Sequence, residues 1–136
     1  MPNRGYRIVD GPDLITAEEV ESRLETVWAG HPVKYLPEVA STNQYAKKIA
    51  EEGAPQGTLV IADHQTRGKG RSGRTWATPR GTAVAMTLVL RPRLAPTRIS
   101  MVRLVMGLAV ARACRDLYQI SAGIKWPNDV VVEGKQ

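Results

Sequence analysis

The sequence lacks any long apolar run. No stretch approaches the roughly 18 apolar residues of a membrane-spanning helix, and no apolar signal-peptide core follows the first five residues. A single cysteine, Cys114, excludes an internal disulfide. Because Cys114 lies in an apolar, helix-like stretch without a histidine nearby in sequence, we expect an inert, partly buried thiol. These absences predict a cytoplasmic protein.

Acidic residues are missing from one segment of an otherwise mixed chain. The net charge of +6 and the pI of about 9.8 invite a nucleic-acid interpretation. The basic residues gather, however, between His64 and Arg80, where no acid occurs, while residues 16–52 carry a surplus of acids. Binding along a duplex needs a broad basic face. The local cluster therefore indicates a small phosphate-bearing ligand.

The length and composition predict one ordinary globular domain. The chain has 136 residues, 43% hydrophobic and 24% charged, without repeats or low-complexity tracts. Alternating and helix-spaced apolar residues predict an α+β fold, with a mixed, largely antiparallel sheet and helices packed on it. Strands are expected at 6–9, 33–39, 58–62, 83–90, 123–126 and from 130. The strand at 83–90 is expected to be a central strand of the sheet. Helices are expected at 17–28, 43–52 and 98–118, the first opened by a capping box at Thr16.

The sequence ends at 133–136, which is turn-like and has no strand behind it. We expect the hairpin around Asn128 and Asp129 to be left with one arm. That would make the chain cut short at its C-terminus.

A glycine-rich segment carries the basic cluster. Gly68-Lys69-Gly70-Arg71-Ser72-Gly73 formally matches G-x-G-x-x-G, but the dinucleotide fingerprint needs a strand before it and a helix after it. Here Pro79 and Gly81 follow and lead into a strand, and the lysine-Ser/Thr ending of a P-loop is absent. A flexible basic surface loop and an anion site both remain open.

A second motif is Lys125-Trp126-Pro127-Asn128-Asp129. It fits ordinary edge-strand and turn chemistry. It also fits a lysine that points from a sheet into a pocket and attracts a carboxylate or phosphoryl oxygen, with Asn128 or Asp129 helping to hold Mg²⁺.

The third motif, Ser41-Thr42-Asn43, precedes a predicted helix. All three residue types cap helices well, so one of them is expected to cap this one. A helix N-terminus also offers polar groups to a ligand.

Taken together, these motifs resemble the biotin protein ligases. Their order and approximate spacing match that family over residues 33–136, with Gln65 between the first and second motifs and Trp76 closing the second. The resemblance implies the class II aminoacyl-tRNA synthetase-like catalytic domain of biotin/lipoate ligases, incomplete at its C-terminus. One departure is Lys69, where the family usually has arginine. Lysine keeps the charge but loses the bidentate fork.

Residues 1–32 carry a fainter resemblance. They are similar to the end of a winged-helix domain plus a linker helix, as in bifunctional ligase/biotin operon repressors. DNA is therefore an expected partner only if a winged-helix domain is present in the full-length protein.

The resemblance implies an activity and its partners. A family member activates biotin with ATP and Mg²⁺ to biotinyl-5′-AMP. It then transfers biotin to a lysine of the biotin carboxyl carrier protein of acetyl-CoA carboxylase. A homodimer is also consistent with the resemblance, and the chain alone is expected to be weakly active or inactive.

The resemblance assigns roles to residues as well. Arg71 and Lys125 are the expected catalytic residues, and Asn128 and Asp129 the expected metal ligands. Biotin is expected to contact Ser41, Thr42, Asn43, Gln65, Arg71 and Lys125. ATP or the adenylate is expected to contact Gly68, Lys69, Gly70, Arg71, Gly73, Arg74, Trp76 and Asn128.

Two alternatives stay open. A lipoate-protein ligase of the same fold would use the same acceptor-lysine chemistry on another cofactor, and a non-catalytic DNA-binding biotin regulator would use the positive charge. His31 and His64 are expected to be surface residues rather than part of a catalytic or metal-binding set.

Overall fold

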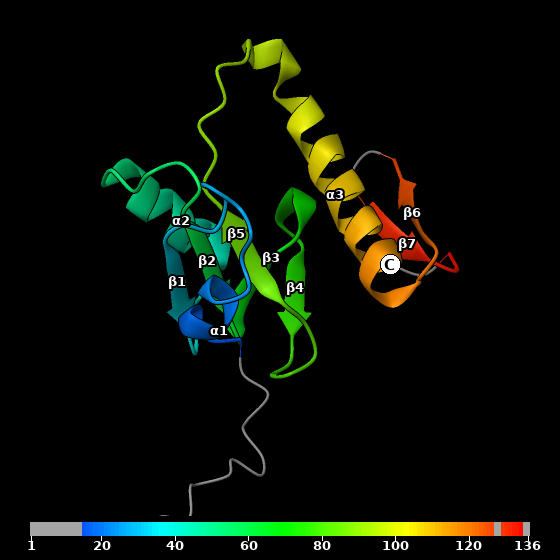
Figure 1. The fold of residues 1–136 in the computed structure, drawn as a ribbon, viewed down its shortest axis with the longest axis horizontal. Helices are drawn as coiled ribbons and strands as arrows, with labels where there is room; N and C mark the ends of the chain where they lie inside the picture. The colour runs from blue at the N-terminus through cyan, green and yellow to red at the C-terminus, as the bar shows by residue number, and fades with distance from the viewer. Residues whose placement is uncertain (1–14, 127–128, 135–136) are drawn as a thin grey trace, which may run out of the picture. The chain divides into compact units, whose positions relative to one another are not determined.

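The computed structural model describes residues 15–126 and 129–134, with backbone only at Arg71 and Thr78. The chain divides into two compact units, Met1–Arg91 and Pro92–Gln136 (Figure 1). The strand expected at 6–9 lies outside the described residues. The domain boundary expected at residue 32 stays a prediction.

The first unit is built on a three-stranded sheet. Its strands are β1 (Val33–Leu36), β2 (Leu59–Ala62) and β5 (Ala85–Leu88), in the order β1-β2-β5. β1 runs parallel to β2, and β5 runs antiparallel to β2. Paired on both sides, β2 is the central strand, and Val60 is fully buried. The expectation that 83–90 forms a central strand is wrong: in the described part of the chain, β5 is an edge strand.

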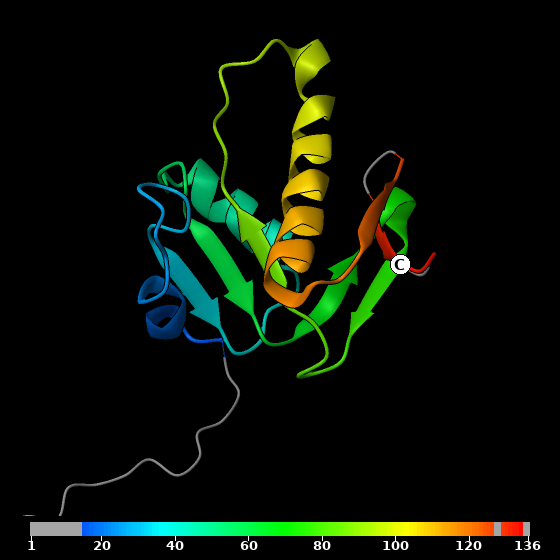
Figure 2. The same ribbon diagram turned by 45° about the vertical axis from the view of Figure 1, so that its right-hand side comes forward.

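Helix α2 (Thr42–Glu51) covers one face of this sheet, as Figure 2 shows. Its Ala46 packs with Val60 of β2 and with Val89, just beyond β5. Small and β-branched side chains let the helix approach the sheet closely. This packing holds the first turn of α2 over the middle of the sheet.

The glycine-rich segment is a β-hairpin, where a flexible loop was one expectation. β3 (Gln65–Lys69) and β4 (Thr75–Thr78) pair antiparallel around the 3₁₀ turn η1 (Arg71–Gly73). The pairing shifts by a bulge between Gln65 and Gly68. Ser72 and the following glycine both have positive φ, so the chain reverses tightly at the turn.

The first helix is shorter than expected. α1 spans Ala17–Glu21, and the Thr16 hydroxyl caps it by accepting from the Glu19 amide at 3.3 Å, as expected. The extension of this helix to residue 28 is wrong. The Glu21 carboxylate instead accepts from the Val33 amide, and Val27 is 95% exposed, so no buried surface supports further helical turns.

The second unit combines one long helix and a hairpin. A 3₁₀ turn, η2 (Pro96–Arg98), leads into α3 (Ser100–Tyr118), and β6 (Ala122–Lys125) pairs antiparallel with β7 (Asp129–Val132). All four residues of β6 are paired with β7. The expectation of a hairpin with one arm is therefore wrong.

Most of the large apolar side chains along α3 are exposed. Gly107 and Ala111 are buried, whereas Val105 and Leu117 are 62% and 73% exposed. Cys114 is partly buried, as expected.

The fold class is confirmed as α+β. Of the four strand pairings among the described residues, three are antiparallel and one is parallel. None of the described helices is long and apolar enough to cross a membrane.

Candidate functional site

The N-terminus of α2 is capped by a side chain from another element. Gln65 Oε1, at the start of β3, accepts from the Thr42 amide at 2.9 Å and from the Thr42 hydroxyl at 3.1 Å. Ser41 is the N-cap residue, as expected of one of residues 41–43, but its side chain makes no cap hydrogen bond. This arrangement ties the hairpin to the start of α2.

A strand residue that the sequence reasoning missed completes the polar network. The Thr87 hydroxyl on β5 lies 3.0 Å from Thr42 Oγ1 and 3.0 Å from Asn43 Oδ1. A polar side chain on the α2-facing side of an otherwise apolar strand is the sequence signal that could have found it. Four side chains from α2, β3 and β5 are thereby fixed relative to one another.

Ser41 is buried beside this network. It is 3% exposed, and its hydroxyl has no hydrogen-bond partner in the part of the chain that the structure describes. Buried hydroxyls are normally paired. An unpaired one beside a cavity is available to a ligand.

Ser41, Thr42, Asn43 and Gln65 line one cavity of about 200 Å³. Its polar, uncharged part is formed by the α2 N-terminus and Gln65, while the hairpin adds a cation and an aromatic ring, and β5 with the residues before it adds apolar surface. The lining residues are Ser41, Thr42, Asn43, Gln65, Lys69, Trp76, Ala83, Val84, Ala85 and Met86. Residues 83–86 were not among the expected site residues.

The glycines of the hairpin have backbone roles of their own. A Cβ at Gly68 would lie 2.4 Å from the Trp76 carbonyl oxygen, closer than any real contact, and 3.4 Å from Gln65 Nε2. A Cβ at Gly70 would meet Arg74 at an ordinary 3.5 Å. Gly68 is therefore required by the close pairing of β3 with β4, whatever its role toward a nucleotide.

The two arginines of the motif lie at the turn of the hairpin. Arg71 opens η1, and the Arg74 carbonyl accepts from the Gly70 amide at 2.7 Å to close the turn. Arg74 is exposed. The adenylate contacts expected of both residues stay predictions.

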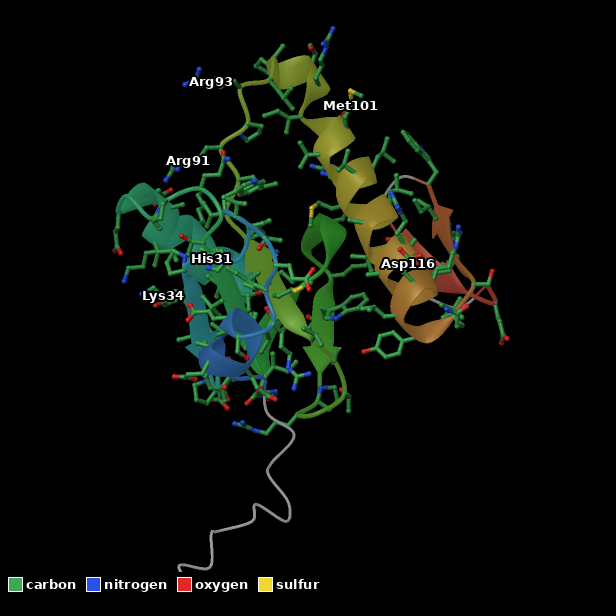
Figure 3. All side chains as sticks on the ribbon, viewed as in Figure 1. His31, Lys34, Arg91, Arg93, Met101 and Asp116 are labelled. Atoms are coloured by element: carbon green, nitrogen blue, oxygen red, sulfur yellow. The ribbon has the colours of Figure 1, made fainter. Side chains whose placement is uncertain are left out.

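Other polar groups of the first unit are structural. Arg91 donates to the carbonyls of Ala50 and Ala54 at the end of α2, at 2.7 and 2.9 Å (Figure 3). His31 is exposed, as expected, with Nε2 3.0 Å from the Thr26 carbonyl oxygen; His64 is half-buried rather than on the surface.

A second cavity of about 380 Å³ is lined by Asp63, Arg80 and their neighbours. The Tyr35 phenol donates to Asp63 Oδ2, and Arg80 pairs with Glu38. The hydrogen bond to Asp63 is the main cause that raises the pKa of Tyr35 above its ordinary value of about 10. Desolvation and the charge of Asp63 act in the same direction, and Arg80 opposes them.

Lys125 belongs to the second unit. It is exposed at the end of β6, where its backbone lies opposite Asp129 in the register of β6 with β7. Asn128 lies outside the described residues. No group of three or more His, Cys, Asp or Glu residues comes together in the described ranges, and the metal-ligand roles expected of Asn128 and Asp129 stay predictions.

The sequence and the fold both match known ligases. Residues 35–136 match the biotin/lipoate A/B protein ligase family. The chain is 35% identical over 133 residues to the bifunctional ligase/repressor BirA of Bacillus subtilis, a match that covers 98% of this chain and 41% of that protein. It is 34% identical over 125 residues to the biotin–[acetyl-CoA-carboxylase] ligase of Mycobacterium tuberculosis, covering 86% of this chain and 47% of that protein.

Two solved structures share the fold. Biotin protein ligase from Aquifex aeolicus, in complex with biotin and ATP, superposes with a TM-score of 0.62 and 35% identity, over 72% of this chain and 40% of that one. Biotin protein ligase from Leishmania major, in complex with biotinyl-5-AMP, superposes with a TM-score of 0.63 and 29% identity, over 76% of this chain and 48% of that one.

The fold is thus that of a biotin ligase catalytic domain. The chain belongs to the biotin/lipoate A/B protein ligase family. It spans less than half the length of the curated relatives described above, 41% and 47% respectively.

Proposed function

We propose that this chain serves the ATP-dependent activation of biotin to biotinyl-5′-AMP and the transfer of biotin to a lysine of a biotin carboxyl carrier protein. The observation that carries the proposal is the cavity in which Ser41, Thr42, Asn43 and Gln65 meet Lys69 and Trp76. All six were expected at the site from the sequence.

The polar part of the cavity suits the head of biotin. A cyclic urea presents one carbonyl acceptor and two N–H donors. The cavity offers uncharged hydroxyl and amide groups from Ser41, Asn43 and Gln65, and small-molecule sites typically combine apolar surface with a few such groups. The dithiolane ring of lipoate has no urea to use them. This difference favours biotin over lipoate as the substrate.

The charged part of the site suits the reaction. In the first step a biotin carboxylate oxygen attacks the α-phosphorus of ATP, and the bond to pyrophosphate breaks. Two anions must meet, so cations that offset their repulsion lower the barrier. Lys69 lines the cavity, and we assign the same task to Arg71 and to Lys125.

In the second step the carrier lysine amine attacks the acyl carbon, and AMP leaves. Trp76 is 52% exposed, which leaves ring surface for stacking on adenine. Closure of the β3–β4 hairpin over the adenylate would exclude water, which otherwise hydrolyses the anhydride.

Mg²⁺ enters this proposal with ATP, because Mg²⁺ is commonly held by substrate phosphates and one or two carboxylates. Asp129 and Asn128 are the proposed protein ligands. When bound, the ion supplies positive charge to the phosphate oxygens.

A DNA-binding role is the second candidate, because a relative that covers 98% of this chain is named a ligase/repressor. A gel shift with duplex DNA that weakens as salt increases would favour it. A homodimer, and a biotin carboxyl carrier protein as partner, are further proposals.

The test of the proposed function is the product itself. The chain is incubated with biotin, ATP, Mg²⁺ and a biotin carboxyl carrier domain, and biotin on the carrier is measured by mass spectrometry. Biotin on one carrier lysine, dependent on ATP, supports the proposal. Because the 136-residue chain alone is expected to be weakly active or inactive, the same assay is run with the full-length protein. Absence of both biotinyl-5′-AMP and biotinylated carrier there overturns the proposal.

A further inference from the structure

Thr87 lies beneath the first turn of α2 without lining the cavity itself. It is paired with Val60 in the middle of the sheet. Side chains two residues apart on a strand share a face, so Thr87 points to the same side as Val89, which packs against Ala46 of α2. Its hydroxyl, 3.0 Å from both Thr42 Oγ1 and Asn43 Oδ1, therefore acts on the cavity only through those two residues.

The protons of this network can be assigned from one fixed donor. The Thr42 backbone N–H can only donate, so the Gln65 atom that it contacts must be the carbonyl oxygen. That oxygen also accepts the single proton of the Thr42 hydroxyl. Thr42 Oγ1 must then accept from Thr87, whose one proton is shared with Asn43 Oδ1.

This assignment sets what the polar wall presents to a ligand. With its oxygen turned to Thr42, Gln65 keeps its amide N–H groups for another partner, and Asn43, with its oxygen turned to Thr87, does the same. The buried Ser41 hydroxyl adds a third donor. A wall of neutral donors recognises a carbonyl oxygen.

We propose that Thr87 is a positioning residue: through Thr42 and Asn43 it holds the amide groups of the cavity with their donors inward, and so selects a ligand that carries a carbonyl acceptor. This inference rests on the proposed function, where that acceptor is the urea carbonyl of biotin. The same cavity would gain nothing from Thr87 when it binds a dithiolane ring of similar size.

The test compares Thr87→Val with Thr87→Ser in the 136-residue chain. Valine keeps the shape and the β-branching but has no hydroxyl, and serine keeps the hydroxyl. Kd is measured by equilibrium dialysis for biotin and, as the probe without a urea, for lipoate. Unfolding midpoints are measured alongside, with Thr87→Ala as the second variant without a hydroxyl in case the valine variant does not fold.

We expect Thr87→Val to weaken biotin binding about 5- to 10-fold, the size of one lost hydrogen bond. Thr87→Ser should stay within about twofold of the parent, and lipoate binding should be the same in all variants. A purely structural role would weaken both ligands together.

The outcomes separate the two proposals. If the parent binds biotin and the valine and alanine variants bind it equally well, or lose biotin and lipoate in proportion, the role of Thr87 is wrong and the proposed function stands. If the parent binds no biotin, the proposed function fails, and the inference fails with it.

Discussion

Gln65 does two things at the residue scale: it caps a helix and it lines the cavity. Replacing it with leucine keeps the size but removes the acceptor for the Thr42 amide. Loss of a helix cap costs about 1 kcal/mol of unfolding free energy, and loss of the polar contact should weaken biotin binding about tenfold. Denaturant unfolding and equilibrium dialysis measure the two effects.

The matched control is Gln44→Leu, because Gln44 is an exposed glutamine on α2, the helix that Gln65 caps. It should change neither quantity. Equal losses in both variants would show that the effect of Gln65→Leu comes from added apolar surface.

Tyr35 gives a pH-dependent prediction. Its pKa is raised by the hydrogen bond to Asp63, so the folded state holds this proton more tightly than the unfolded state. The stabilisation is complete below about pH 10 and is lost as the pH rises through the folded pKa. Tyr35→Phe should abolish this part of the alkaline loss of stability.

The direct measurement is tyrosinate absorbance, taken as the difference between the parent and Tyr35→Phe. Asp63→Ala should return the pKa of Tyr35 toward its ordinary value. An unchanged midpoint in Asp63→Ala would contradict the assignment.

At the residue scale, the sequence predicted which residues form the site better than it predicted the hydrogen bonds between them. Ser41, Thr42, Asn43, Gln65, Lys69 and Trp76 were all expected at one site, and all line one cavity. The N-cap position at Ser41 was predictable, but the side chain that accepts from the Thr42 amide was not, because it belongs to Gln65, 23 residues away from Thr42. Thr87 was missed because a threonine in a strand is ordinary and only the fold places it under α2.

The β3–β4 hairpin carries the prediction at the element scale. Gly68→Ala would push a Cβ against the Trp76 carbonyl, with 2.4 Å between them, and against the Gln65 amide. Either β3 separates from β4 or Gln65 moves, so biotin binding should fall at least tenfold and amide exchange in 65–78 should quicken.

Gly70→Ala is the internal control for that experiment. Its Cβ would make only an ordinary contact with Arg74, so stability and biotin binding should be retained. If ATP binding alone falls in Gly70→Ala, the backbone there approaches the nucleotide. Equal tolerance of both substitutions would contradict the paired geometry of the hairpin.

Elements were predicted well where local pattern and burial agree. The sequence placed α2, β2 and α3 to within two residues at either end. It overextended α1 because the apolar spacing of Val27 and Trp28 suggested a helical face, although no surface lies against Val27. A flexible loop was one interpretation of 65–78, because glycine and lysine are depleted in strands. Pairing of β3 with β4 outweighs that preference.

At the scale of the whole molecule, the proposed chemistry needs both units. Lys125 lies in the second unit and the cavity in the first. If the Lys125 ammonium offsets charge in adenylation, Lys125→Ala should lower biotin-dependent pyrophosphate release at least tenfold, or about 1.4 kcal/mol. Biotin Kd should change less, and the unfolding midpoint little, because Lys125 is exposed.

Lys47→Ala controls for the loss of one positive charge, since Lys47 is an exposed lysine on α2. It should retain full activity. A loss in Lys125→Ala that is matched by unfolding, or by Lys47→Ala, would remove Lys125 from the reaction.

The fold class could be predicted from the whole sequence, whereas the burial of each helix face could not. Periodicity reports which face of an element is apolar, and it is silent on which neighbour covers that face. The exposed Val105 and Leu117 of α3 illustrate the difference. Their spacing predicted a helix, and only the structure shows that these side chains are exposed.

The central claim is that this chain activates biotin with ATP. The most direct measurement is pyrophosphate release by the full-length protein, with the 136-residue chain alongside, in the presence of ATP and Mg²⁺ and in parallel with biotin, with lipoate and with neither. We predict release that depends on biotin, falls at least tenfold in Gln65→Leu, and does not exceed background with lipoate. Release that is equal with biotin and lipoate, or that is indifferent to biotin, would contradict it.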